Sequence, residues 1–141
     1  PDEDTKTGRV AAMIGQGQVQ ASPMAMAAVA ASVEAGRTVI PVLVDKYAPT
    51  SKAKPLTSGE AGQLRAMMRR TVTNGSATFL RSYEKLGAKT GTAEYGTDDP
   101  PRTHAWMIVE GDDLALAVFV ADGDSGSATA GPIVRAVLAS R

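Results

Sequence analysis

Hydrophobic positions in the first half of the chain are spaced for helices. Met24 to Ala35 is apolar nearly all the way round a helix, and Ser22-Pro23 supplies an N-cap followed by proline at the first helical position. Gly36 is a typical helix stop. A helix with so wide an apolar surface is expected to be buried against other helices.

A second helix is predicted from its cap, Ser58, to about Thr73. Asn74-Gly75 then ends it. Its apolar stripe consists of Leu64, Met67, Met68 and Val72. A short helical stretch is expected within residues 77–85.

Strand patterns dominate the last third of the chain. Alternating or β-branched residues predict strands at 87–95, 104–109 and 114–121. Earlier in the chain, the β-branched residues 38–44 predict a further strand, which Pro41 assigns to a sheet edge because proline has no N–H.

Short links and a final helix complete the predicted fold. A tight turn at residues 111–113 joins the last two strands, and Ala128 to Ser140 predicts a closing helix. Its expected inner face consists of Ile133, Val134, Val137 and Leu138. Sequential strands with short connections favour an α+β fold, in which an antiparallel sheet is covered by helices.

Composition excludes several classes of function. Lys plus Arg and Asp plus Glu both number 15, so the basic surface that nucleic acid binding needs is absent and no nucleic acid partner is expected. The chain has no cysteine and one histidine, which argues against disulfides, thiol catalysis and a metal site. No cofactor is expected.

Residues 1–9 are charged and are expected to form a frayed acidic terminus. They show neither an initiator methionine nor a signal-peptide pattern, so a cut site is expected here. No apolar run approaches the roughly 20 residues of a membrane span. The chain is therefore expected to be part of something larger.

The tripeptide Lys-Thr-Gly occurs twice, at residues 6–8 and at residues 89–91. The first copy lies in the charged terminus and is interpreted as solvated loop. The second lies on a predicted strand, where Lys89, Gly91 and Ala93 point one way and Thr90, Thr92 and Glu94 the other. On the tripeptide alone, an ordinary surface strand is the favoured interpretation.

Such a strand has the groups that an acyl-transfer site needs. The N–H of the residue after the glycine, Thr92, can donate to an oxyanion, and the ammonium and hydroxyl groups can hold a carboxylate. Glycine at position 91 keeps the strand open to a ligand backbone.

Other patterns do not complete a known site. Gly15-Gln16-Gly17 lacks the third glycine of a dinucleotide fingerprint, and Gly87 to Thr90 lacks the glycines of a phosphate-binding loop. The paired aspartates at 98–99 and 112–113 fit turns. His104 is interpreted as a hydrogen-bonded structural residue, and Trp106 as a packing residue.

Four segments, in order, resemble penicillin-binding protein transpeptidase domains. The first, Ile14-Gly15-Gln16-Gly17 with Ser22-Pro23-Met24-Ala25-Met26-Ala27, is similar to the family's IGQG loop and following helix. Lys89-Thr90-Gly91-Thr92-Ala93-Glu94 is similar to its KTGTAE strand, and His104-Ala105-Trp106-Met107 to its HAWF strand. Ala130-Gly131-Pro132-Ile133 then leads into the final helix. Residues 10–141 thus resemble the C-terminal part of a class B transpeptidase domain.

The resemblance implies the fold shared by serine transpeptidases and serine β-lactamases. It implies a peptidoglycan D,D-transpeptidase that binds β-lactams and cross-links stem peptides through a serine acyl-enzyme. The residues carried over as catalytic are Lys89, Thr90 and Gly91. Thr90, Thr92, Ala93 and Glu94 would bind substrate, and the Thr92 N–H would form half of the oxyanion hole. Tyr95 would lie at the edge of the cleft.

The family's Ser-x-x-Lys nucleophile and its Ser-x-Asn are missing from the expected place. Ser51 to Lys54 and Ser82 to Lys85 match the first pattern but are interpreted as coincidence, and no Ser-x-Asn occurs. The main partner implied is therefore the N-terminal part of the same protein, without which this chain is not catalytic. Cell-division proteins, and an N-terminal anchor at the extracytoplasmic face of the bacterial plasma membrane, are also implied.

Two alternatives stay open. A D,D-carboxypeptidase or serine β-lactamase shares the Lys-Thr-Gly strand, although the IGQG segment favours a transpeptidase. A non-catalytic sensor or scaffold that binds β-lactams or wall peptides would lack the upstream Ser-x-x-Lys.

Overall fold

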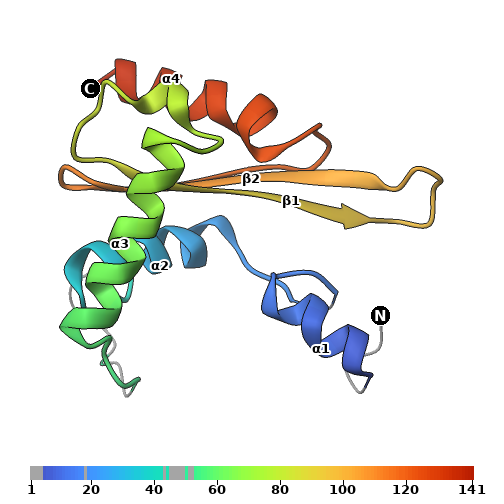
Figure 1. The fold of residues 1–141 in the computed structure, drawn as a ribbon, viewed down its shortest axis with the longest axis horizontal. Helices are drawn as coiled ribbons and strands as arrows, with labels where there is room; N and C mark the ends of the chain where they lie inside the picture. The colour runs from blue at the N-terminus through green and yellow to red at the C-terminus, as the bar shows by residue number, and fades with distance from the viewer. Residues whose placement is uncertain (1–4, 18, 43, 45–49, 51–52) are drawn as a thin grey trace.

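The computed structural model describes residues 5–17, 19–42, 44, 50 and 53–141. Its helices are α1 (Lys6–Met13), α2 (Pro23–Ala35), α3 (Ser58–Thr73), the short 3₁₀ helix η2 (Thr78–Leu80), the π-helical turn η3 (Gly126–Ala130) and α4 (Gly131–Ala139). Its strands are β1 (Gly87–Tyr95), β2 (Arg102–Gly111) and β3 (Leu114–Val120). Figure 1 shows α4 on one side of the sheet, α2 on the other, and α1 set apart near the far end of β1.

The strands form the predicted antiparallel meander, in the order β1-β2-β3. Gly91 pairs with Trp106, and Trp106 pairs with Phe119. The β2–β3 turn is tight, because Gly111, Asp112 and Asp113 all have positive φ values (109°, 55° and 60°). The expected α+β fold with a helix-covered antiparallel sheet is confirmed.

Two hydrophobic clusters lie on the two faces of the sheet. The first cluster, under α4, includes Val72, Ala77, Leu80, Leu86, Ala88, Met107, Val109, Val134 and Leu138. The second cluster, under α2, consists of Ala30, Val33, Met68 and Ile108, with Met26, Leu64, Ala115 and Ala117 packed against it. Because Met68 and Val72 belong to different clusters, α3 contributes to both layers, and Figure 1 shows it crossing the sheet.

The two longer helices begin and end where local chemistry dictates. In α2, the Ser22 hydroxyl accepts from the Ala25 N–H at 3.1 Å, and Gly36 adopts a left-handed conformation at the C-cap. The N-cap of α3 is Thr57, one residue before the predicted Ser58. Thr57 forms a capping box with Glu60, which satisfies two backbone N–H groups at once.

Residues 38–42 and 44 contain no strand, so that prediction was wrong. The Val39 N–H donates instead to the Ser32 hydroxyl of α2 at 2.9 Å. This N–H is therefore not available to pair with a neighbouring strand. Residues 6–9, expected to be frayed, form the first turn of α1. The Thr5 hydroxyl accepts from the Gly8 N–H at 3.0 Å and caps this helix.

Three predicted core positions and one packing expectation also need correction. Met67, Ile133 and Val137 are exposed, because each precedes a buried residue and is rotated about 100° from it around the helix. The buried neighbours are Met68, Val134 and Leu138. The apolar helix α2 packs mainly on the sheet, over β3 and β2, and only secondarily on α3.

Candidate active site

β1 carries the second Lys-Thr-Gly and lies at an edge of the sheet. Within the described residues it pairs only with β2, so its other edge has no strand partner. Lys89 lies opposite Ile108 of the second cluster, and Ala88 opposite Val109 of the first. Paired residues share a face, so the alternation of Lys89 and Thr90 between faces is as predicted.

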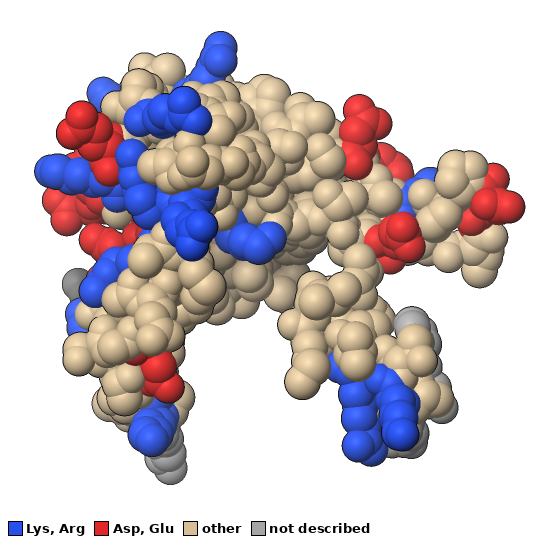
Figure 2. Space-filling view, viewed as in Figure 1, with Lys and Arg blue, Asp and Glu red and all other residues tan. Residues whose placement is uncertain are grey.

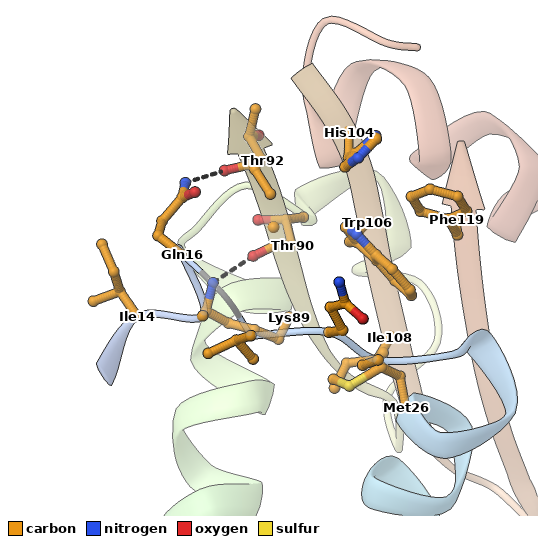
Figure 3. Close-up of a pocket in the computed structure, with 16 residues that line it drawn as sticks. Ile14, Gln16, Met26, Lys89, Thr90, Thr92, His104, Trp106, Ile108 and Phe119 are labelled. Carbon is orange, nitrogen blue, oxygen red and sulfur yellow. Dashed lines mark hydrogen bonds between the residues drawn. The ribbon is translucent and has the colours of Figure 1, made fainter. Parts of the chain in front are cut away.

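A cavity of about 600 Å³ opens on the sheet face that carries Lys89. Its walls come from the α1–α2 loop, from β1, and from the aromatic and aliphatic side chains of β2 and β3 (Figure 3). Figure 2 shows the molecule hollowed between α1 and the α2–α3 pair, with few charged side chains at the surface of the hollow. The cavity is therefore largely apolar and has a polar edge along β1.

The loop after α1 reaches the free edge of β1. The Gln16 Nε2 donates to the Thr92 carbonyl oxygen at 3.2 Å, and the Lys89 ammonium contacts the Thr90 carbonyl (Figure 3). In an antiparallel strand the N–H and C=O of one residue point to the same side. The Thr92 N–H therefore also points to the free edge.

The hydroxyls of Thr90 and Thr92 are contacted from outside the strand. Ser76, in the turn after α3, lies with its Oγ 2.8 Å from the Thr90 Oγ1. The Gly126 N–H, at the start of η3, donates to the Thr92 Oγ1 at 3.4 Å. Neither Ser76 nor Gly126 was singled out from the sequence.

Gly126 lies against the backbone of both β1 and β2. A Cβ at this position would be 2.3 Å from the Trp106 carbonyl oxygen and 2.8 Å from that of Gly91. Only glycine permits so close an approach. This contact fixes η3 against the Lys-Thr-Gly strand.

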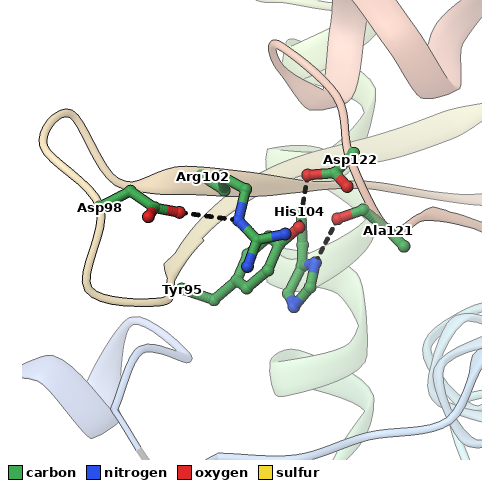
Figure 4. A network of polar contacts seen from close by, with 6 residues as sticks. All are labelled: Tyr95, Asp98, Arg102, His104, Ala121 and Asp122. Carbon is green, nitrogen blue, oxygen red and sulfur yellow. Dashed lines mark hydrogen bonds and ion pairs between the residues drawn. The ribbon is translucent and has the colours of Figure 1, made fainter.

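A polar network closes the far end of β1 (Figure 4). The rings of Tyr95 and His104 stack at 3.8 Å between centroids, and the Arg102 guanidinium lies 4.7 Å from the Tyr95 centroid. The Tyr95 hydroxyl donates to the Asp122 carboxylate, which raises the pKa of Tyr95. Arg102 also pairs with Asp98 at 3.0 Å.

His104 makes a structural hydrogen bond, as predicted from the sequence. Its Nδ1 lies 2.6 Å from the Ala121 carbonyl oxygen, which accepts only, so Nδ1 carries the proton. The ring also lines the cavity together with Ala93. Glu94 is exposed on β1 outside the cavity lining.

The other sequence matches do not join this site. The first Lys-Thr-Gly lies in helix α1, not in a loop as interpreted. Ser82 is exposed, and Lys85 pairs with Asp112 of the β2–β3 turn at 3.4 Å. Ser51 lies outside the described residues.

Neither a metal centre nor a membrane span is found in the part of the chain that the structure describes. No three His, Cys, Asp or Glu side chains are grouped there to hold a metal ion. No helix there is long and apolar enough to cross a bilayer.

Comparison with known proteins identifies the class to which this sheet and strand belong. The family model of the penicillin-binding protein transpeptidase domain matches residues 3–139. The chain therefore belongs to the penicillin-binding protein transpeptidase family, and the resemblance drawn from its motifs is confirmed.

The particular relatives include two mycobacterial enzymes. Peptidoglycan D,D-transpeptidase PbpA of Mycobacterium tuberculosis is 32% identical over 149 residues, which cover 89% of this chain and 30% of that protein. PbpA of Mycolicibacterium smegmatis is 33% identical over 151 residues, with 90% and 30% covered. The match thus spans about 30% of the length of these relatives.

A solved structure shows the same fold. The crystal structure of Pseudomonas aeruginosa PBP2, in complex with WCK 5153, superposes with a TM-score of 0.65 at 24% identity. The match covers 89% of this chain and 30% of that one.

Proposed function

We propose that this chain supplies the substrate-binding strand of a peptidoglycan D,D-transpeptidase that works through a serine acyl-enzyme. The observation that carries the proposal is the free edge of β1, where the Thr92 N–H and C=O point outward beside Lys89 and Thr90. The mycobacterial relatives are named as D,D-transpeptidases.

An extended stem peptide, or a β-lactam in its place, binds along this edge as an added strand. The Thr92 carbonyl accepts a ligand amide N–H, and the Gln16 side-chain amide that it binds in the structure is chemically equivalent to such a donor. The Thr92 N–H stabilises the oxyanion that forms when the scissile carbonyl is attacked. Lys89 and the Thr90 hydroxyl hold the terminal carboxylate by charge-assisted hydrogen bonds.

The nucleophile belongs to a segment of the same protein outside this chain, which carries the Ser-x-x-Lys and Ser-x-Asn. Its serine attacks the D-Ala-D-Ala carbonyl, D-Ala leaves, and the amine of a second stem takes over the acyl group. The open apolar cavity, with Trp106 and the 37%-exposed Phe119 on its wall, provides a surface for that segment to cover. The complete protein acts at the extracytoplasmic face of the plasma membrane, with cell-division proteins as partners.

The test is intact mass spectrometry of the complete protein before and after benzylpenicillin, followed by peptide mapping. We expect one penicillin adduct, located on a serine outside residues 1–141. The absence of any adduct contradicts the proposal and favours a non-catalytic module. An adduct on Ser82 or Ser51 would show that the nucleophile has been misassigned.

A further inference from the structure

The turn after α3 holds Ser76 rigidly beside β1. The N–H groups of Gly75 and Ala77 both donate to the Thr71 carbonyl, at 3.1 and 3.0 Å. Ala77 is fully buried in the first cluster, and a Cβ at Gly75 would lie 2.9 Å from the Thr71 Cα. The backbone on both sides of Ser76 is therefore fixed, although the serine itself is exposed.

The direction of the Ser76–Thr90 hydrogen bond decides what Thr90 can do. The two hydroxyl oxygens are 2.8 Å apart, and either one can be the donor. A hydroxyl has a single proton, so Thr90 can donate to a ligand only if it accepts from Ser76. A donor behind Thr90 also polarises its O–H and strengthens the next hydrogen bond.

Thr92 shows the same arrangement with an unambiguous donor. Its hydroxyl accepts from the Gly126 N–H at 3.4 Å, which leaves the threonine proton free to point elsewhere. Both threonine hydroxyls of the strand are thus contacted by a group from another element, from the α3 turn in one case and from η3 in the other.

We propose that Ser76 is a positioning residue for the carboxylate subsite. Its hydroxyl donates to Thr90, and the Thr90 proton is thereby directed to the carboxylate of the stem peptide or β-lactam. This inference rests on the proposed function, in which Thr90 binds that carboxylate. Ser76 acts through Thr90 and touches neither the scissile bond nor the oxyanion.

The test compares two ligands that differ only in the carboxylate, benzylpenicillin and its methyl ester, on the complete protein. Ser76→Ala should lower the second-order acylation rate with benzylpenicillin by up to about tenfold, because the Thr90 hydroxyl loses the donor that orients and polarises its bond to the charged ligand. The rate with the ester should stay unchanged, and Ser76→Thr should restore the rate with the acid. The matched control is Thr73→Ala, which removes a nearby exposed hydroxyl bonded to the Asn74 Oδ1.

A double-mutant cycle separates positioning from general stabilisation. In a Thr90→Ala background, Ser76→Ala should have no further effect on acylation, since the hydroxyl that it orients is gone. If the wild type acylates, three results would each overturn the inference. They are equal losses of rate with the acid and the ester, additive effects of the two substitutions in the cycle, and a Ser76→Ala rate equal to that of the wild type. If the wild-type protein forms no penicillin adduct, the proposed function is contradicted, and this inference, which rests on it, is contradicted too.

Discussion

The buried carboxyl group of Glu110 on β2 interacts with the carboxyl group of Glu34 at the C-terminal end of α2. Glu110 is only 2% exposed, and burial, followed by the neighbouring Glu34 carboxyl group, raises its pKa to about 8 against the opposing effect of the Arg65 charge. Arg65 donates to the Val33 and Glu34 carbonyls at 3.1 and 2.9 Å. A Cβ at Gly87 would lie 2.1 Å from the Glu110 Oε1, so glycine there makes room for this pair.

Stability should therefore fall as the pH rises from about 5 to about 8. The pKa of Glu110 is higher in the folded than in the unfolded protein, so folding favours the protonated form and the contribution is lost as pH passes through the folded pKa. Thermal melting of the complete protein at several pH values should show this slope, and Glu110→Gln should reduce it. Glu94→Gln, on an exposed carboxylate of the same sheet, is the control. An unchanged slope in Glu110→Gln would show that the raised pKa of Glu110 is not the source of the pH dependence.

Gly126→Ala should destabilise the protein by about 2–3 kcal/mol or prevent folding, because the new methyl group meets the backbone of two strands. Gly62→Ala in α3 is the matched glycine substitution, since no atom lies within 4 Å of its Cβ position. It should stabilise the protein by about 0.5–1 kcal/mol through helix propensity. Melting temperatures of both variants test the pair. Equal effects would mean that η3 does not contact β1 as described.

Thr92→Pro should lower the penicillin acylation rate by about 100- to 1000-fold, as expected for one lost oxyanion-hole donor. Because the Thr92 N–H points to the free edge, proline there removes no bond of the β1–β2 ladder. Proline also removes the hydroxyl that accepts from the Gly126 N–H, so Thr92→Val, which loses the hydroxyl but keeps the N–H, is the reference for both the rate and the melting temperature. Thr92→Ser keeps both the N–H and the hydroxyl and should acylate at nearly the wild-type rate. A Thr92→Pro protein that is folded and reacts normally would exclude this N–H from the oxyanion hole.

Thr57→Ala should cost about 1 kcal/mol, the usual contribution of an N-cap. Ser58→Ala should be nearly neutral, because the hydroxyl of Thr57, not that of Ser58, accepts the Glu60 N–H at 3.2 Å. Urea unfolding of the two variants distinguishes them directly. The reverse order of stability would restore Ser58 as the cap.

Local patterns predicted the sheet well, because its signals lie within each strand. The alternation from Gly87 to Tyr95 gave the bounds of β1, and the paired aspartates gave the β2–β3 turn. The strand expected at 38–44 failed, because β-branched residues specify a strand only when a neighbour offers backbone groups to pair with. Here the Ser32 hydroxyl binds the Val39 N–H first.

Local sequence patterns could not predict the contacts that other elements make with the Lys-Thr-Gly strand. Ser76 precedes Thr90 by 14 positions and Gly126 follows Thr92 by 34, and the two residues of each pair lie on different elements, so no periodicity within one helix or strand connects them. The signal available for Ser76 was only the Asn-Gly helix end next to it. Gly126 lies in a Gly- and Ser-rich loop, where a glycine needed for close backbone approach looks like any other.

Helix α3 makes the two layers of this molecule a single cooperative unit. Met68 and Val72, one turn apart, are buried in clusters on opposite faces of the sheet. Arg69, between them, donates to the Tyr83 and Leu86 carbonyls just before β1. Neither layer can open without exposing part of α3 and loosening the approach to β1, so slow amide exchange should be lost in both layers together.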